Sequence, residues 1–213
     1  ICVVGDGEIT FLKLLDYFKL HPTRRQLDFT GLHQIKGLAF IDKNNKLKVT
    51  GNAEQLPASE LIFHDLDKQR LGLQKFGGNG ELIHEFFPPM EAKEAYWPKK
   101  WLSSPEGLKF LEKNINKTIA AISTTRGCVA RCTFCQRYTK GYRVFAPNHF
   151  ESHIIELKEK YNVRGVFIND ENSLSDRKQS YEVARLLKKH NLYWSCEGVR
   201  VTSVTYEDLK FYK

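Results

Sequence analysis

The feature that most constrains the fold is an alternation of strand-like and helix-like segments from residue 118 onward. Three short runs rich in β-branched and apolar residues have the length of strands: TIAAIST (118–124), RGVFIND (164–170) and LYWSCEGV (192–199). Segments with helical spacing separate them. Strands that alternate with helices are joined as parallel neighbours by crossover connections, so we predict an α/β fold with a parallel sheet. In such folds the chemistry lies at the carboxyl ends of the strands.

The helices between these strands carry start signals. Asn148 and Glu151 are spaced as a capping box, and Thr205 and Asp208 form a second candidate box. Another helix is expected within 176–191. The first of these helices repeats its large apolar residues on one face, which we expect to be buried: Phe150, Ile154, Leu157 and Tyr161.

The start of the chain also alternates. Residues 1–18 (ICVVGDGEITFLKLLDYF) indicate a short strand, a glycine-bearing turn and an amphipathic helix. A hairpin is expected next, in which Leu38 and Phe40 face Leu47 and Val49 across the turn residues DKNN. The apolar stripe of the helix consists of Phe11, Leu14, Leu15 and Phe18.

These patterns divide the chain into three parts. Residues 1–50 form a small α/β domain, residues 51–117 a linker with short helices, and residues 118–213 the strand-helix region. Within the linker, SPEGLKFLEKN (104–114) is the best helix candidate. Because the chain opens inside an apolar run and its only methionine is Met90, we expect it to be truncated at the N-terminus. We expect the same at the C-terminus, where the last helix has no stop signal.

Composition excludes some classes of protein. The 213 residues are 41% hydrophobic and 27% charged, which is enough apolar surface for a sizeable core. No apolar run approaches the roughly 20 residues of a membrane-spanning helix. No signal peptide opens the chain, so we predict a cytoplasmic protein. The net charge of +8 is spread among acidic residues, which favours a solvated basic surface over a nucleic-acid site.

Three of the five cysteines lie within eight residues, in the segment RGCVARCTFC that follows the first predicted strand. Cys128, Cys132 and Cys135 are spaced C-x3-C-x2-C. Thiolates at this spacing suit zinc or an iron–sulfur cluster, whereas disulfides are rare in cytoplasmic proteins. Structural zinc would require a fourth ligand, and Cys196 or His149 would have to supply it. A cluster with one iron left unbound by protein fits the three thiols best.

This segment resembles the signature of the radical S-adenosylmethionine (radical SAM) superfamily. The match includes the preceding strand and the aromatic Phe134 directly before the third cysteine. The resemblance implies that Cys128, Cys132 and Cys135 bind three irons of a 4Fe-4S cluster. It also implies that the amine and carboxylate of S-adenosylmethionine bind the fourth iron.

The resemblance continues at the ends of the next two predicted strands. GVFINDENSL is similar to the family strand whose end contacts the amine of the cosubstrate, which makes Asn169, Asp170 and Glu171 candidates. The commoner Gly-Gly-Glu form is absent, so the assignment among them is open. WSCEGVRVTSVTYEDLKF is similar to members with an N-terminal cobalamin-binding domain, and Glu197 and Arg200 match there as cosubstrate-site residues.

The opening segment is similar to the tail of that cobalamin-binding domain, where a strand ends in Gly-Glu-Gly-Glu or a variant. Here the residues are Gly5, Asp6, Gly7 and Glu8, and the two glycines would let a bulky cofactor approach the backbone. The family's cobalt-ligating Asp-x-His-x-x-Gly motif would lie upstream of Ile1. Whether cobalamin is bound is therefore left open.

Together the resemblance implies the C-terminal part of a Rossmann-like cobalamin-binding domain, followed by the first strand-helix units of a radical SAM partial (β/α) barrel. The function implied is reductive cleavage of S-adenosylmethionine to a 5′-deoxyadenosyl radical, leading to methyl transfer or rearrangement. A low-potential electron donor such as flavodoxin or ferredoxin is the implied partner. This stretch of chain could be inactive by itself, and no catalytic residue is assigned.

Two alternatives remain. One is a zinc-stabilised basic module that binds nucleic acid, in which CQRYTKGYR (135–143) would interleave basic and aromatic side chains. The other is a cluster protein that transfers electrons without cleaving S-adenosylmethionine. The substrate cannot be inferred from the fold class.

Overall fold

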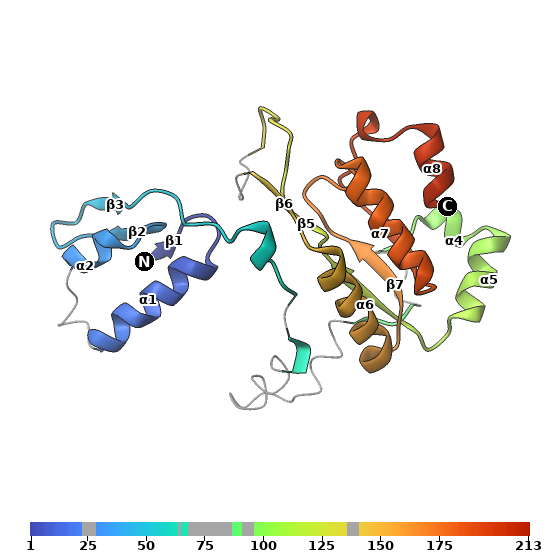
Figure 1. Cartoon of the computed structure of the whole chain (residues 1–213), viewed down its shortest axis with the longest axis horizontal. Coiled ribbons are helices and arrows are strands. Elements are labelled where there is room, and N and C mark those ends of the chain that lie inside the picture. The colour runs from blue at the N-terminus through green and yellow to red at the C-terminus, as the bar shows by residue number, and fades with distance from the viewer. Residues whose placement is uncertain (23–28, 64, 68–86, 91–95, 136–140) are drawn as a thin grey trace. The chain divides into compact units, whose positions relative to one another are not determined.

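The structure is a computed structural model that describes residues 1–22, 29–63, 65–67, 87–90, 96–135 and 141–213 (Figure 1). The chain divides into two compact units. The first comprises Ile1–Glu60 with Arg131–Gly141, and the second comprises Leu61–Ala130 with Tyr142–Lys213. Much of the predicted linker, 68–86 and 91–95, lies outside the described residues.

The first unit is a small antiparallel sheet with two helices. Its strands lie in the order β1-β2-β3, and both neighbouring pairs are antiparallel. The elements are β1 (Cys2–Val3), α1 (Glu8–Leu20), α2 (Phe29–Gln34), β2 (Leu38–Ile41), β3 (Leu47–Val49) and the 3-10 turn η2 (Ala58–Glu60). The predicted strand, glycine turn, helix and hairpin are thus confirmed as elements. Their core consists of Leu14, Tyr17, Leu32, Ile35, Leu38 and Phe40.

The hairpin differs from the prediction in which side chains share a face. Ala39 lies opposite Val49 and Ile41 lies opposite Leu47. Because directly opposed residues project from the same side of a sheet, Leu47 and Val49 do not face the buried Leu38 and Phe40. The turn explains the one-residue difference. The carboxylate of Asp42 accepts hydrogen bonds from the amides of Asn44 and Lys46, at 2.8 and 2.9 Å, and closes a longer loop than expected.

Helix α1 also presents a different stripe to the core. Its buried residues are Thr10, Leu14 and Tyr17, whereas Phe11 is 53% exposed and Leu15 is 41% exposed. Of the predicted stripe only Leu14 is buried. The Thr10 hydroxyl donates to the carbonyl of Lys36 at 2.9 Å, which fixes the rotation of the helix through a polar contact that apolar periodicity does not register.

The second unit is built on a parallel sheet with strand order β4-β7-β8, which confirms the predicted parallel arrangement. Its strands are β4 (Thr118–Ile122), β5 (Thr125–Gly127), β6 (Tyr142–Val144), β7 (Val163–Ile168) and β8 (Tyr193–Cys196). Its helices are α4 (Lys99–Leu102), α5 (Pro105–Lys113), α6 (Pro147–Tyr161), α7 (Arg177–Lys189), the 3-10 turn η5 (Val201–Ser203) and α8 (Tyr206–Tyr212).

Both faces of the parallel sheet are covered. Helices α6 and α7 pack on one face, where Ala120 and Ile122 of β4 join the larger core cluster. The neighbouring residue Ile119 belongs to a second cluster with Met90, Trp97 and Phe110 on the opposite face. All four apolar residues predicted for the face of α6 are buried: Phe150, Ile154, Leu157 and Tyr161. The 2.0-residue alternation of β4 thus matches two separate apolar layers.

One of the two predicted capping boxes is confirmed. Thr205 and Asp208 form the predicted capping box of α8, and Asp176 caps α7 by accepting from the Gln179 amide. The predicted box at Asn148 and Glu151 is wrong, because α6 begins at Pro147. Proline has the backbone torsion of a first helical residue and needs no amide partner there. The Glu151 carboxylate instead accepts hydrogen bonds from Lys189 and His190, both at 2.7 Å.

Candidate functional site

A two-stranded antiparallel ribbon brackets the cysteine segment. Strand β5 pairs with β6 in the register Thr125 to Val144 and Gly127 to Tyr142. Gly127 has a positive φ of 80°, a backbone conformation that favours glycine, directly before Cys128. This ribbon was not predicted from the sequence. Its two strands come from the ends of the segment that contains all three clustered cysteines.

All three clustered cysteines are free thiols. Cys128 and Cys132 are half-buried and Cys135 is exposed, while Phe134 is 89% exposed. The Ala130 amide donates to the Cys128 sulfur at 3.3 Å. Cys128 belongs to the second unit, whereas Cys132 and Cys135 belong to the first.

Among the residues that the structure describes, no three Cys, His, Asp or Glu side chains are grouped to hold a metal ion. The ligand role of the three cysteines therefore stays a prediction. So does the alternative zinc site. The imidazole Nδ1 of His149 lies 3.1 Å from the Leu61 carbonyl oxygen, and the thiol of Cys196 is half-buried in the second unit.

A buried carboxylate ties the end of β4 to the end of β7. Asp170, which is 7% exposed, accepts hydrogen bonds from the Thr124 amide at 2.7 Å and the Thr124 hydroxyl at 2.6 Å. It also accepts from the Thr125 amide at 3.0 Å. The Thr124 hydroxyl in turn accepts from the Gln179 side chain at 2.8 Å. Three elements of the second unit meet at this point, immediately before the cysteine segment.

The other predicted residues at the end of β7 lie at its surface. Asn169 continues the parallel ladder, because its amide donates to the Ile122 carbonyl at 2.8 Å, and its side chain is exposed. Glu171 is also exposed. Both side chains therefore lie at the carboxyl edge of the sheet, where parallel folds bind ligands.

The turn after β8 packs against this edge. Gly198 has a φ of +68°, and a Cβ built on it would lie 3.3 Å from the Asp170 carbonyl oxygen. The same Cβ would lie 3.4 Å from the Glu171 carbonyl oxygen. The structure thus brings the ends of β7 and β8 together, as parallel pairing predicts. Glu197 and Arg200, on either side of this turn, are both exposed.

Two buried polar residues after β7 were not predicted as site residues. Asn172 is 3% exposed and Ser173 is 1% exposed, and their side-chain polar atoms have no hydrogen-bond partner among the described residues. The same holds for the Thr125 hydroxyl. A buried polar group without a partner costs about 1–3 kcal/mol. The sequence signal was present as the polar run that follows Glu171.

A cavity of about 300 Å³ opens at the carboxyl ends of β7 and β8. Phe167 and Ser195, which lie opposite each other in the ladder, line it together with Glu197. The Ser195 hydroxyl donates to the Tyr96 carbonyl at 2.6 Å and closes one side. This cavity places Glu197 beside a space that could receive a small ligand.

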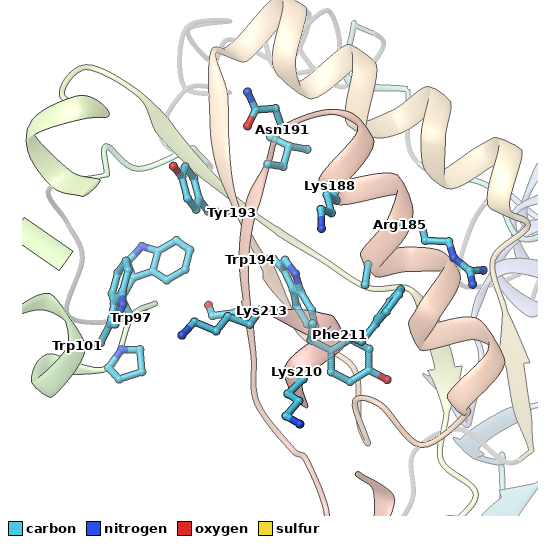
Figure 2. A pocket seen from close by; sticks show the side chains of 15 residues that line it. Trp97, Trp101, Arg185, Lys188, Asn191, Tyr193, Trp194, Lys210, Phe211 and Lys213 are labelled. Carbon is cyan, nitrogen blue, oxygen red and sulfur yellow. The ribbon is translucent and has the colours of Figure 1, made fainter. Parts of the chain in front are cut away.

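A larger cavity of about 740 Å³ runs along β8, which among the described strands pairs only with β7 (Figure 2). Its walls combine aromatic and basic side chains. The aromatic residues include Trp97, Trp101, Trp194 and Phe211, and the basic ones are Arg185, Lys188, Lys210 and Lys213. It lies on the open edge of the sheet rather than at the ends of the strands.

Two groups near Asp170 have shifted acid–base properties. Burial raises the pKa of the Cys196 thiol to about 11, and the negative charge of Asp170 adds to the shift. Burial also raises the pKa of Tyr142, with smaller contributions from the negative charges of Asp176 and Asp170. At neutral pH both groups are therefore protonated.

None of the helices in the described residues is long and apolar enough to span a membrane. Residues 136–140 of the basic segment CQRYTKGYR lie outside the described part of the chain. The predicted nucleic-acid surface there is therefore not described.

Comparison with known proteins gave one curated relative and two solved structures, and no family model matches the chain. The relative is cytidylyl-2-hydroxyethylphosphonate methyltransferase of Streptomyces wedmorensis, which is 22% identical over 197 residues. The match covers 90% of this chain, and the chain spans 34% of the length of that relative. The sequence is thus similar, at low identity, to that of a methyltransferase.

Both solved structures are of the cobalamin-dependent S-adenosylmethionine radical enzyme OxsB. One, with aqua-cobalamin and S-adenosylmethionine bound, matches 86% of this chain with a TM-score of 0.48 and 16% identity. The other, with aqua-cobalamin bound, matches 94% of this chain with a TM-score of 0.49 and 16% identity. The matches cover 21% and 24% of those chains.

Proposed function

We propose that this chain contributes the cluster-binding and cosubstrate-binding part of a radical SAM methyltransferase. The observation that carries the proposal is the position of the C-x3-C-x2-C segment, which begins at Cys128 directly after β5. The chain reaches this segment from the carboxyl end of β4, the edge at which parallel folds bind ligands. The sequence likeness to a methyltransferase supports methyl transfer as the reaction class.

The donor set fits an iron–sulfur cluster. Three free thiols from Cys128, Cys132 and Cys135 supply the soft ligands that such clusters require, and leave one iron for another molecule. When bound, the cluster supplies the electron that cleaves the sulfonium of S-adenosylmethionine. The task of the chain is to hold the thiolates, orient the cosubstrate and limit the access of water.

Polar residues at the same edge are proposed to bind the cosubstrate. The exposed Asn169 and Glu171 would accept hydrogen bonds from its ammonium group. Glu197, beside the cavity of about 300 Å³, would contact its ribose or amine, and Arg200 its carboxylate. Phe134, which precedes the third cysteine, would pack against it.

The first unit is proposed to contribute to a cobalamin site. Gly5 has a φ of +95°, which favours glycine. Gly7 has an ordinary helical φ of −91°, and a Cβ there would meet only Val3, at 3.7 Å. Neither the backbone nor packing against the described residues requires glycine at position 7. The missing side chain at Gly7 would therefore leave room for a bound group to come close to the backbone.

Methyl transfer would also require a partner that supplies electrons. A low-potential donor such as flavodoxin or ferredoxin in the cytoplasm is part of the proposal. The alternative zinc-stabilised module stays a prediction, as does the cluster, because the described residues hold no grouped set of ligands for either metal.

Anaerobic reconstitution of the chain with iron and sulfide tests the proposal, followed by counting of iron, sulfide and zinc. The matched variants are Cys→Ser substitutions at the three clustered positions, with Cys2→Ser and Cys196→Ser as controls. About four irons per chain are expected in the wild type and in the controls, and fewer in each of the three cluster variants. One zinc per chain without iron would favour the alternative module instead.

A further inference from the structure

We propose that Asp170 is a positioning residue for the cysteine segment rather than a ligand of the cosubstrate. Its carboxylate fixes the backbone at Thr124 and Thr125, which leads through β5 to Cys128. This inference rests on the proposed function, because it takes the cysteines as cluster ligands. Asp170 and Cys128 are separated by 42 positions in the sequence, so only the fold connects them.

The hydrogen bonds occupy most of the acceptor capacity of the carboxylate. One oxygen of Asp170 accepts from the amides of both Thr124 and Thr125, and the other accepts from the Thr124 hydroxyl. A carboxylate has about four lone-pair sites, and three of them are engaged here. The exposed neighbours Asn169 and Glu171 keep their side chains at the surface, which leaves them better placed to contact a ligand.

The two amides need this acceptor. Thr124 is 3% exposed and Thr125 is 5% exposed, so solvent has little access to either residue. Thr124 lies in the turn between the parallel strand β4 and the antiparallel strand β5, and Thr125 is the first residue of β5, where the chain enters a second sheet. Backbone amides at such a junction lose their ladder partners and must be satisfied by another group. Asp170 is that group.

Asp170 is itself held on two sides. Next to it, the Asn169 amide continues the ladder to Ile122 of β4. The turn at Gly198 packs against the carbonyl of Asp170. Because the backbone at Asp170 is held in this way, its carboxylate can define the position of the backbone that it binds.

A third element adds to the anchor. Asp176 caps α7 by accepting from the Gln179 amide at 2.9 Å, and the Gln179 side chain donates to the Thr124 hydroxyl at 2.8 Å. The hydroxyl therefore accepts from α7 and donates to Asp170. The entry to the cysteine segment is thus fixed by groups from β7 and α7 of the second unit.

Hydrogen exchange of the chain without cluster measures this positioning directly. In the wild type, the amides of residues 123–130 are expected to exchange slowly. Asp170→Ala should speed exchange there about tenfold or more, because the two amides lose a charged acceptor. Asp170→Asn, which keeps one acceptor oxygen, should have an intermediate effect. Thr124→Val should remove only the hydroxyl bonds, and serves if Asp170→Ala fails to fold.

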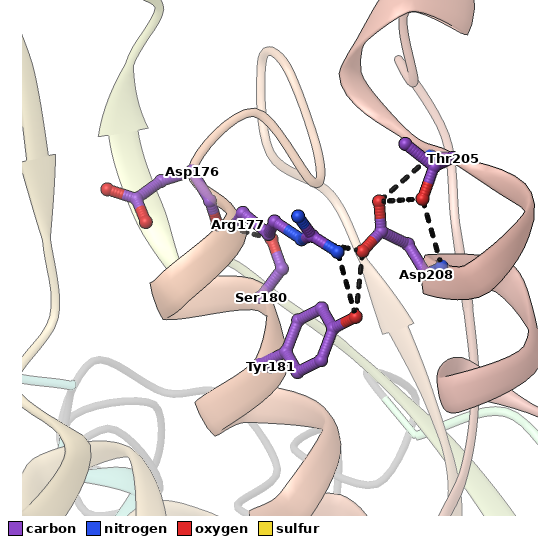
Figure 3. Close-up of polar contacts among 6 residues, drawn as sticks. All are labelled: Asp176, Arg177, Ser180, Tyr181, Thr205 and Asp208. Carbon is purple, nitrogen blue, oxygen red and sulfur yellow. Dashed lines mark hydrogen bonds and ion pairs between the residues drawn. The ribbon is translucent and has the colours of Figure 1, made fainter.

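Asp208→Ala is the matched control. Asp208 is 2% exposed and likewise accepts from the amide and hydroxyl of a threonine, Thr205, each at 2.8 Å (Figure 3). It lies at the start of α8, and among the described residues its hydrogen bonds are to Arg177, Tyr181 and Thr205, none of which belongs to the cysteine segment. The control should speed exchange around Thr205 and leave residues 123–130 unchanged.

After reconstitution, folded Asp170→Ala is expected to retain less than about half of the wild-type iron, whereas Asp208→Ala retains it in full. Asp170→Asn should recover part of the loss. Unchanged exchange at 123–130, or full iron with an unchanged spectrum in a folded Asp170→Ala chain, would overturn the inference. If the wild type binds no iron at all, the proposed function fails, and the exchange result alone then decides whether Asp170 positions the segment.

Discussion

The carboxylate of Asp208 accepts a hydrogen bond from the hydroxyl of Tyr181 at 2.8 Å, which joins α8 to α7 (Figure 3). The same oxygen accepts from the Arg177 guanidinium at 2.8 Å. The other oxygen closes the capping box with Thr205. A single buried carboxylate thus caps one helix and attaches it to its neighbour.

This arrangement predicts a loss of stability in acid. The hydrogen bonds from the Thr205 backbone, the Thr205 hydroxyl and Tyr181 lower the pKa of Asp208 from 3.8 to about 2. Because the pKa of Asp208 is lower in the folded chain, its carboxylate stabilises the fold at pH values above 3.8. That stabilisation is lost as the pH falls from 3.8 through about 2. Between pH 5 and pH 2 the melting temperature should therefore decline less in Asp208→Asn than in the wild type. The variant should also melt several degrees lower at pH 7. Equal declines in the two chains would contradict this.

The core of the second unit should be sensitive to truncation. Ile154 is fully buried between α6 and the sheet, so Ile154→Ala should lower the free energy of unfolding by about 2–5 kcal/mol. Ile115, which is 61% exposed, provides the control, and Ile115→Ala should change it by no more than about 0.5 kcal/mol. Urea denaturation of both variants measures the difference. Similar losses of stability in the two variants would contradict the burial of Ile154 between α6 and the sheet.

Two glycines of the first unit allow the energetic cost of a positive φ to be measured separately from the cost of steric overlap. Gly37 and Gly51 both have positive φ, at 82° and 92°. A Cβ on Gly37 would lie 2.5 Å from the Ala53 Cα, whereas a Cβ on Gly51 would meet nothing within 4 Å. Gly37→Ala should therefore destabilise the first unit by clearly more than the about 1 kcal/mol expected for positive φ alone in Gly51→Ala. Comparable midpoints in urea would argue against the close approach of residues 37 and 53.

The raised pKa of Cys196, about 11, predicts that its thiol reacts slowly with alkylating reagents. At pH 8 only about one in a thousand of these thiols is ionised, against roughly a quarter for an ordinary cysteine of pKa about 8.5. Iodoacetamide should modify Cys196 about a hundredfold more slowly in the folded chain than in urea, as measured by peptide mass spectrometry. The exposed Cys2 serves as the internal control for reagent activity. Equal rates at Cys196 in both states would contradict its burial.

Local patterns predicted the elements well where the signal is strong over many residues. The parallel strands and the buried face of α6 are confirmed, because apolar periodicity and β-branched runs specify them directly. The errors have local polar causes. Asp42 lengthened a turn, Thr10 fixed the rotation of a helix, and Pro147 started a helix that a capping box was expected to start.

The candidate site was only partly accessible to sequence analysis. The cysteine spacing and the polar strand ends could be read from short segments. The contacts between Asp170 and Thr124 could not, since these residues are 46 positions apart and meet only when β4 pairs with β7. The ribbon of β5 and β6 escaped prediction because its two three-residue strands are too short for a periodic signal. Asn172 and Ser173 have no side-chain hydrogen-bond partner among the described residues. Their polar character could be read from the sequence, but their burial could not, because burial is a property of the fold.

Electron paramagnetic resonance of the reduced, reconstituted chain, recorded with and without S-adenosylmethionine, tests the central claim most directly. If Cys128, Cys132 and Cys135 hold a cluster with one iron open to the cosubstrate, the cluster spectrum will change when S-adenosylmethionine is added. The change will be absent in the three Cys→Ser variants and retained in Cys196→Ser. A cluster spectrum that the cosubstrate leaves unchanged, or no cluster spectrum in the wild type, would contradict the assignment of this chain to radical SAM chemistry.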